Sequence, residues 1–214
     1  CAILEPESFL IRSAVAPDFG DGRFKENKAA RDEGRAANAG DVREIISAGD
    51  MDALLGMSEA VRAHKVAAPL LLNTKAEHTI TWTDAETGIA CKARLDLLGA
   101  NYLVDLKSTA DPAPRRFCRS FADYLGHGQL AFYYDGAIAS GALPRDAVYP
   151  YVIAPGKTEP YDVAVYRTHL FALDAGRRLE VVLDVGALHR IGQVGQARLV
   201  VEAQVAPGVA VDRQ

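Results

Sequence analysis

Apolar and polar residues alternate most clearly in the middle of the chain, where they predict consecutive β-strands. Residues 78–84 (HTITWTD) alternate and are rich in β-branched side chains, and residues 85–88 (AETG) form the turn that follows. Residues 89–98 (IACKARLDLL) alternate again, and residues 102–107 (YLVDLK) form a third short strand. In the second strand one face carries Ile89, Cys91, Ala93, Leu95 and Leu97, and the opposite face carries Lys92, Arg94 and Asp96.

Helical spacing of apolar residues predicts three helices. The first covers residues 47–65, where Ser47 and Asp50 form a capping box. The second runs from about 114 to 139, although Gly126 and Gly128 each weaken a helix interior by about 1 kcal/mol and leave a local break open. The third covers residues 170–191, and strands are expected at 147–155 and 161–168.

The order of these elements indicates an α/β fold, with helices packed against a mixed sheet. The chain has 214 residues, of which 49% are hydrophobic and 24% charged, as in an ordinary globular domain. No apolar run approaches the roughly 18 residues of a membrane span. The three cysteines are far apart and form no CxxC motif, so we expect a reducing, cytoplasmic setting.

The net charge of −4 does not by itself indicate nucleic acid as a partner. Locally, however, Lys107 and three arginines follow one another with a single Asp111 among them. These arginines are Arg115, Arg116 and Arg119. The charged stretch at residues 22–35 mixes both signs and is typical of a solvated helix or loop.

The two strands at 89–98 and 102–107 form a hairpin that brings charged residues together. With Ala100 and Asn101 as a two-residue loop, Asp96 lies directly opposite Asp105, about 5 Å away. Lys107 shares their face, because strand side chains repeat every second residue. A four-residue loop would keep all three on one side, whereas an odd loop would turn Asp105 away.

Two carboxylates this close repel each other when both are ionised, and a divalent cation removes the repulsion. Magnesium typically uses one or two protein carboxylates together with water, and a nearby ammonium then positions or deprotonates the water that attacks a phosphodiester. The alternative is a surface hairpin with an ion pair of at most about 1 kcal/mol. The hairpin alone favours this alternative, because its pattern is short enough to occur by chance.

A longer set of segments resembles a known family. ILEPESF, AVRAH, TWTDAETGIACKARLDLL, YLVDLKSTADPAPRRF and SFADYLGHGQLAFYYDG follow in order over residues 3–136. They resemble the PD-(D/E)xK nuclease superfamily, in particular its RecE-type (exonuclease VIII) branch of prophages. The resemblance implies a restriction-endonuclease-like core, a mixed β-sheet flanked by α-helices. It also implies one nuclease domain over residues 1–214, with its core at about 40–192 and a tail at 193–214 of unassigned role.

The resemblance also implies roles for the hairpin residues. Asp96 and Asp105 would be metal ligands, with the backbone carbonyl of Leu106 as a third, and Lys107 would lie beside the attacking water. Glu77, just before the strand at 78–84, would act near the metal through water. The family carries a further metal-site histidine upstream of the segment that begins here with Cys1, so we expect the chain to be part of a longer protein.

On the long helix, Gln129 and Tyr133 match the Gln-x-x-x-Tyr motif of the family. Their spacing places both on one helical face, where they would hold a DNA phosphate or support the site. The alternative is a buried tyrosine beside a satisfied glutamine. His127 is expected to be structural or phosphate-facing, and a salt-dependent contact to the DNA backbone is expected of Arg115, Arg116 and Arg119.

The resulting hypothesis is a Mg²⁺-dependent exonuclease, with Mn²⁺ as a possible substitute, that degrades duplex DNA ends 5′→3′ for phage-type recombination. Its expected partners are double-stranded DNA ends, copies of itself in a ring-shaped homo-oligomer, and a single-strand annealing protein. No association with a membrane is expected. The competing hypothesis is an inactive DNA-binding or assembly module of the same fold. The Gly156-Lys157-Thr158 sequence precedes a strand and is not a phosphate-binding loop, and the histidine spacing does not indicate zinc.

Overall fold

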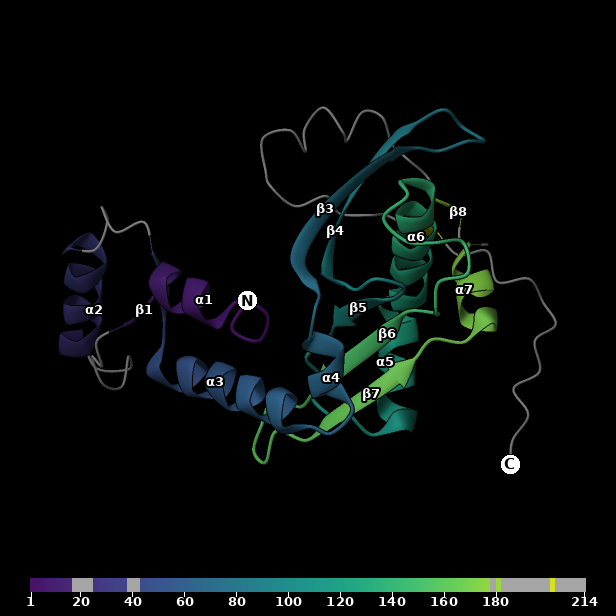
Figure 1. Cartoon of the computed structure of the whole chain (residues 1–214). Helices are drawn as coiled ribbons and strands as arrows, with labels where there is room; N and C mark the ends of the chain where they lie inside the picture. Colours follow the sequence, from purple (N-terminus) through teal and green to yellow (C-terminus); the bar gives the residue numbers. More distant parts are fainter. Residues whose placement is uncertain (17–24, 38–42, 178–179, 182–200, 203–214) are drawn as a thin grey trace.

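A five-stranded mixed sheet forms the centre of the molecule (Figure 1). The computed structural model describes residues 1–16, 25–37, 43–177, 180–181 and 201–202. The strand order is β3-β4-β5-β6-β7, in which β5 and β6 are parallel and the other neighbours antiparallel. The strands are β3 (Lys75–Thr83), β4 (Ala90–Leu98), β5 (Leu103–Leu106), β6 (Tyr151–Pro155) and β7 (Val163–Arg167). This architecture confirms the α/β fold class and the predicted central strands.

Helices cover both faces of the sheet and create two hydrophobic clusters. The α6-side cluster packs the sheet against α5 (Pro114–Asp123), α6 (Gly126–Ala139) and α7 (Leu170–Arg177). The α3-side cluster packs the other face against α3 (Ala48–Ala63) and α4 (Ala67–Leu71). None of the helices in the described ranges is long and apolar enough to cross a bilayer.

The first part of the chain forms a smaller unit to one side of the main sheet (Figure 1). It contains α1 (Pro6–Arg12), β1 (Ser13–Val15), α2 (Lys25–Ala37) and β2 (Glu44–Ile46), and β1 and β2 pair in parallel. Helix α3 follows with the predicted cap, because the Asp50 amide donates to the Ser47 hydroxyl oxygen at 3.1 Å. The Ser47 hydroxyl in turn donates to the Asp50 carboxylate at 2.7 Å.

In the β3–β4 hairpin, the regular alternation of side chains between the two faces of the sheet is interrupted partway along both strands. On β4, Leu95 belongs to the α6-side cluster, whereas Leu97 belongs to the α3-side cluster. On β3, Ile80 belongs to the α6-side cluster, whereas Ala76 packs against the α3-side cluster. The prediction that Leu97 shares a face with Leu95 is therefore wrong, since both strands of this long, curved hairpin (Figure 1) change faces together.

The change of face occurs where Glu77 and Asp96 oppose each other. The flanking ladder pairs are Ala76 with Leu97 and His78 with Leu95. Glu77 has φ = 49°, in the left-handed region that non-glycine residues seldom adopt. This local conformation rotates the chain between the two pairs and explains why simple period-two alternation fails there.

The β4–β5 connection has the predicted register. The Gly99 amide donates to the Tyr102 carbonyl at 2.9 Å, so Ala100 and Asn101 form the two-residue loop. The ladder continues through Leu98 with Leu103 and Leu97 with Val104. The ladder ends there, and Asp96 and Asp105 occupy the next position along the two strands, close enough for Asp96 to affect the pKa of Asp105.

Two helix predictions are wrong in extent. The single helix expected over residues 114–139 is two helices, because α5 ends at Asp123 and Leu125 takes a left-handed conformation with φ = 57° before α6 begins at Gly126. The helix expected over residues 170–191 ends at Arg177, and Glu180–Val181 instead form β8, paired with β9 (Val201–Glu202). The rest of that prediction lies outside the described residues.

Two helical glycines give opposite predictions for replacement by alanine. A Cβ on Gly176 of α7 would lie 2.4 Å from the backbone oxygen of His127 on α6, so Gly176→Ala is expected to lower the free energy of unfolding by about 1–3 kcal/mol. Gly49 of α3 has no heavy atom within 4 Å of the same position, so Gly49→Ala is expected to raise stability by up to about 1 kcal/mol. Urea unfolding of both variants measures the difference. Equal stability of the two variants would contradict the close packing of α7 on α6.

Candidate active site

Asp105 is the most buried charged residue of the candidate site. It lies on β5 beside Val152 of β6 and is only 1% exposed. Its Oδ1 accepts a hydrogen bond from the Lys107 ammonium at 2.8 Å. Its Oδ2 lies 2.7 Å from the same ammonium but receives no well-directed hydrogen bond, since one nitrogen cannot point squarely at both oxygens. The carboxylate is thus neutralised but incompletely hydrogen-bonded.

Asp96 is tied to the same strand through the backbone. Its Oδ2 accepts a hydrogen bond from the Leu106 amide at 2.8 Å. The β4–β5 ladder has ended at Leu97 with Val104, so the Asp96 side chain replaces a ladder acceptor at the point where the strands part. Because the amide and carbonyl of one strand residue face the same neighbour, the Leu106 carbonyl is directed toward this side of β5 as well.

The surroundings of Asp105 favour its neutral form. Burial raises the pKa of Asp105 to about 6, Lys107 opposes this increase, and the nearby Asp96 adds to it. Lys107 is partly exposed, with 34% of its side chain open to solvent. Its ammonium therefore contacts both the buried carboxylate and solvent.

These groups fit a magnesium ion that keeps part of its water shell. Magnesium binds through one or two carboxylates and completes its six positions with water or substrate oxygens. Asp105, with an unsatisfied oxygen, and Asp96 beside it provide that pair, and the Leu106 carbonyl is an additional oxygen donor. Within the described residues no three His, Cys, Asp or Glu side chains converge, so a site that depends on three such ligands does not fit.

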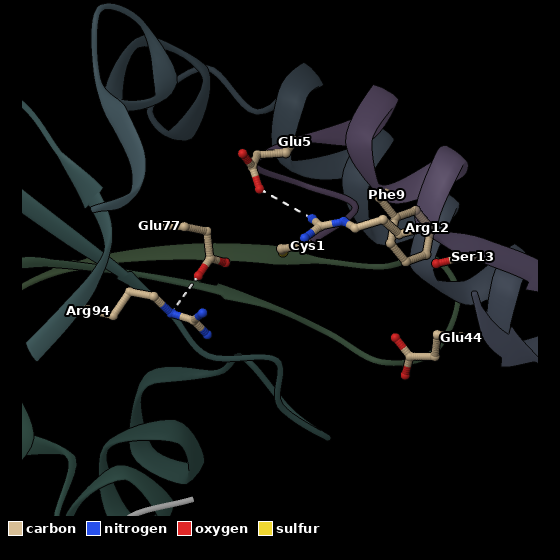
Figure 2. Close-up of a pocket in the computed structure, with 8 residues that line it drawn as sticks. All are labelled: Cys1, Glu5, Phe9, Arg12, Ser13, Glu44, Glu77 and Arg94. Atoms are coloured by element: carbon tan, nitrogen blue, oxygen red, sulfur yellow. Dashed lines mark hydrogen bonds and ion pairs between the residues drawn. The ribbon is translucent and has the colours of Figure 1, made fainter. Parts of the chain in front are cut away.

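Glu77 lies inside β3, not before it, and is engaged by an arginine. Its carboxylate lies 3.0 Å from the guanidinium of Arg94, which precedes Asp96 by two residues on β4. Figure 2 shows this pair on one side of a pocket of about 420 Å³, facing the Arg12–Glu5 ion pair of α1. The full lining is Cys1, Glu5, Phe9, Arg12, Ser13, Glu44, Glu77 and Arg94.

The residues predicted on α6 contact one another. The Gln129 amide donates to the Tyr133 hydroxyl at 2.8 Å, and Tyr133 packs against the α6-side cluster. Tyr133 is only partly buried, so the geometry matches the glutamine part of the alternative but not a fully buried tyrosine. Burial lowers the pKa of His127, whose backbone oxygen lies against α7. A contact of these residues with a phosphate stays a prediction.

The three arginines predicted to guide DNA are exposed on α5, which follows the site along the chain. Arg116 forms an ion pair with Asp111 at 3.3 Å. Arg119 only approaches Asp123, at 4.0 Å. Arg115 is exposed, and no ion pair involves it among the described residues. Helix α5 therefore presents positive charge to solvent. No hydrogen bond or ion pair joins these three arginines to Asp96 or Asp105 in the described structure.

Sequence reasoning missed the arginines that line the pocket. Arg94 could have been noticed, because it shares the polar face of its strand with Asp96. Arg12 could not, since α1 reaches the pocket only through the tertiary arrangement of the first unit against the sheet. Each of these arginines neutralises a glutamate at the edge of the candidate site.

The raised pKa of Asp105 predicts a pH-dependent stability. Below about pH 4 the Asp105 carboxyl is protonated in both the folded and unfolded states. Between about pH 4 and pH 6 it ionises in the unfolded state first, which lowers the stability of the folded state, and above about pH 6 this loss is complete. The free energy of unfolding of the wild type, relative to Asp105→Asn, should therefore fall by about 3 kcal/mol between about pH 4 and pH 7. Urea unfolding in EDTA measures this difference. A relative stability that rises with pH would mean that the pKa is lowered instead.

No curated protein matches this chain. Among solved structures, one is a "Putative exonuclease" from Eubacterium rectale, with 14% identity, a TM-score of 0.46, and coverage of 70% of this chain and 57% of that chain. Another is SSO0001, with 13% identity, a TM-score of 0.33, and coverage of 78% of this chain and 73% of that chain. The chain thus spans little more than half the length of the first.

The family assignment comes from the sequence itself. Residues 16–183 match the family described as "PDDEXK-like domain of unknown function (DUF3799)". The match includes the complete β3–β4–β5 region with Glu77, Asp96, Asp105 and Lys107, and it agrees with the PD-(D/E)xK superfamily that the sequence motifs resemble. The chain therefore belongs to the PDDEXK-like domain family DUF3799.

Proposed function

We propose that this protein is a magnesium-dependent nuclease that hydrolyses phosphodiester bonds in DNA. The observation that carries the proposal is the Asp105 carboxylate, which is buried, incompletely hydrogen-bonded, adjacent to Asp96 and covered by Lys107. A buried carboxylate destabilises the fold when ionised, so its position beside a second acid favours a role in binding a cation. Membership of the PDDEXK-like family supports the same conclusion.

Each residue of the cluster has a distinct part in this proposal. Asp105 and Asp96 hold the cation, with the Leu106 carbonyl as the third protein donor. Magnesium bound there supplies positive charge that stabilises the phosphorane-like transition state and activates water. The Leu106 amide fixes the direction of the Asp96 carboxylate, so the two acids keep their relative position without the cation.

Lys107 works at the solvent side of the cluster. Its ammonium has three hydrogen-bond donors, and Asp105 does not use all of them in the described structure. The remaining donors are available to orient an attacking water molecule and to hold a non-bridging phosphate oxygen. Tyr133 and Gln129 support α6 against the sheet on the same side as Asp105.

The substrate proposed for this nuclease is the end of a DNA duplex, and the proposed assembly is a ring of identical subunits. The ordered motifs resemble RecE-type exonucleases, which supports 5′→3′ digestion of duplex ends, a ring-shaped homo-oligomer and cooperation with a single-strand annealing protein in recombination. Manganese is expected to replace magnesium, since it takes similar oxygen ligands. The exposed arginines of α5 provide a contact to the phosphate backbone.

A second candidate function is a DNA-binding or assembly module without turnover. The observation in its favour is that the acids near the site are already neutralised, Asp105 by Lys107 and Glu77 by Arg94. Such pairs stabilise a fold without any cation. The two functions differ in whether a divalent cation binds at Asp105 and whether DNA is cut.

The activity prediction concerns Lys107. Lys107→Ala should lower the rate of cleavage of an end-labelled duplex in Mg²⁺ by about 100-fold or more, because a positioned proton donor or acceptor contributes at least this much to such reactions. Lys65→Ala, which removes an exposed lysine that follows α3, is the matched control and should change the rate far less. The lengths of the labelled products over time also report exonucleolytic action and polarity. Equal rates for the wild type and Lys107→Ala would reject this mechanism.

The metal prediction concerns Asp105. Magnesium at about ten times its dissociation constant should stabilise the wild type by about 1.4 kcal/mol, seen as a rise of a few degrees in the melting temperature above pH 7. Asp105→Asn should abolish the rise, because the amide carries no charge. Asp111→Asn, outside the cluster, should keep it. Stabilisation of Asp105→Asn equal to that of the wild type would favour the module without turnover.

A further inference from the structure

The break between α5 and α6 exposes an aromatic side chain that its helix would otherwise bury. On α5, Phe117 and Phe121 face the core and stack with their ring centroids 5.5 Å apart. Helical periodicity places Tyr124 on this same face, since residues at i, i+4 and i+7 lie in one row. Tyr124 is nevertheless 86% exposed, because α5 ends just before it.

The geometry of the break is fixed by close packing. A Cβ on Gly126 would lie 2.3 Å from the ring of Phe121, so the first residue of α6 must be glycine for the two to touch. Leu125 adopts a left-handed conformation, which is unfavourable by about 1–2 kcal/mol for a residue with a Cβ. The junction between α5 and α6 is therefore strained at Leu125 and closely packed at Gly126, and it leaves the ring of Tyr124 exposed to solvent.

The charge around the ring suits nucleic acid. Helix α5 carries three arginines, all exposed, and a single acid, Asp123, in a chain whose net charge is −4. Arg119 is 87% exposed at its side chain, and its closest carboxylate contact is 4.0 Å. An exposed ring at the end of a helix that carries exposed cations is a combination by which proteins bind single strands, since bases stack on the ring and phosphates meet the cations.

We infer that Tyr124 is a base-stacking residue of a single-stranded nucleic-acid site, with Arg115 and Arg119 of α5 contacting the adjacent phosphates. The inference rests on the proposed nuclease function, for which a strand separated at a duplex end is the chemical species that would reach this helix. The site is distinct from the Asp96–Asp105–Lys107 cluster and requires no metal ion. It adds to the proposed nuclease a surface that holds one strand without reading its sequence.

The test is binding of a fluorescein-labelled oligothymidylate of about 20 nucleotides to the full chain in EDTA, followed by anisotropy. Tyr124→Ala should weaken binding about tenfold, within the range that loss of one stacked base produces. Tyr124→Leu should bind as weakly as Tyr124→Ala, because it restores apolar volume but no aromatic face. Tyr124→Phe and Tyr124→Trp should bind like the wild type.

Two further variants separate stacking from other effects. Phe171→Ala removes a 77% exposed ring from α7 and serves as the matched control, with unchanged affinity expected. Arg119→Ala should lower the slope of log affinity against log salt by about 0.7, whereas Tyr124→Ala should leave that slope unchanged. Melting temperatures like that of the wild type are expected for all Tyr124 variants, because the ring is exposed.

The inference is wrong if Tyr124→Ala or Tyr124→Leu binds the oligothymidylate as tightly as the wild type, or if the wild type does not bind it. The proposed function has a separate criterion, duplex cleavage by the wild type against Lys107→Ala. If the protein cuts duplex DNA but the Tyr124 variants bind the single strand as tightly as the wild type, only the inference is overturned. A protein that binds through Tyr124 but never cuts overturns only the nuclease proposal.

Discussion

The burial of one carboxylate, Asp105, governs the arrangement of the site. A charge in the middle of a sheet requires a partner, and Lys107, one residue beyond the end of β5, provides it at 2.8 Å. The charge is paired, but one carboxylate oxygen lacks a directed hydrogen bond, and burial raises the pKa of Asp105 to about 6. The fold thus retains a local instability, which a bound cation would relieve.

The change of face in the β3–β4 hairpin explains how a second acid reaches Asp105. Regular alternation starting from Leu95 would direct Asp96 away from the α6 side, whereas alternation starting from Leu98 directs it toward that side. The irregular position opposite Glu77 lets the Asp96 carboxylate turn to the Leu106 amide. The left-handed backbone at Glu77 on β3 and the end of the β4–β5 ladder thus lie on either side of Asp96.

Sequence patterns predicted those parts of the molecule that depend on local rules. The two-residue loop, the register of Asp96 with Asp105 and the capping of α3 follow from turn length, period-two alternation and one hydrogen-bonding side chain. The break at Leu125 and the Glu77–Arg94 pair did not follow, because they depend on the ring of Phe121 against Gly126 and on a strand that leaves its ideal conformation. Tertiary contacts decided both, and helix propensity alone indicated only that a break near Gly126 was permitted.

The charged side chains near the site form ion pairs between residues that lie on the same element or on adjacent ones. Lys107 holds Asp105, Arg94 holds Glu77, and Arg116 holds Asp111. In the proposed nuclease, Asp105 and Asp96 would hold a divalent cation that balances their charge, and more of the Lys107 donors would then be available to bind an anion. Phosphate affinity would then be higher when the cation is present, so the ion pair favours binding of the cation before DNA without any change of fold.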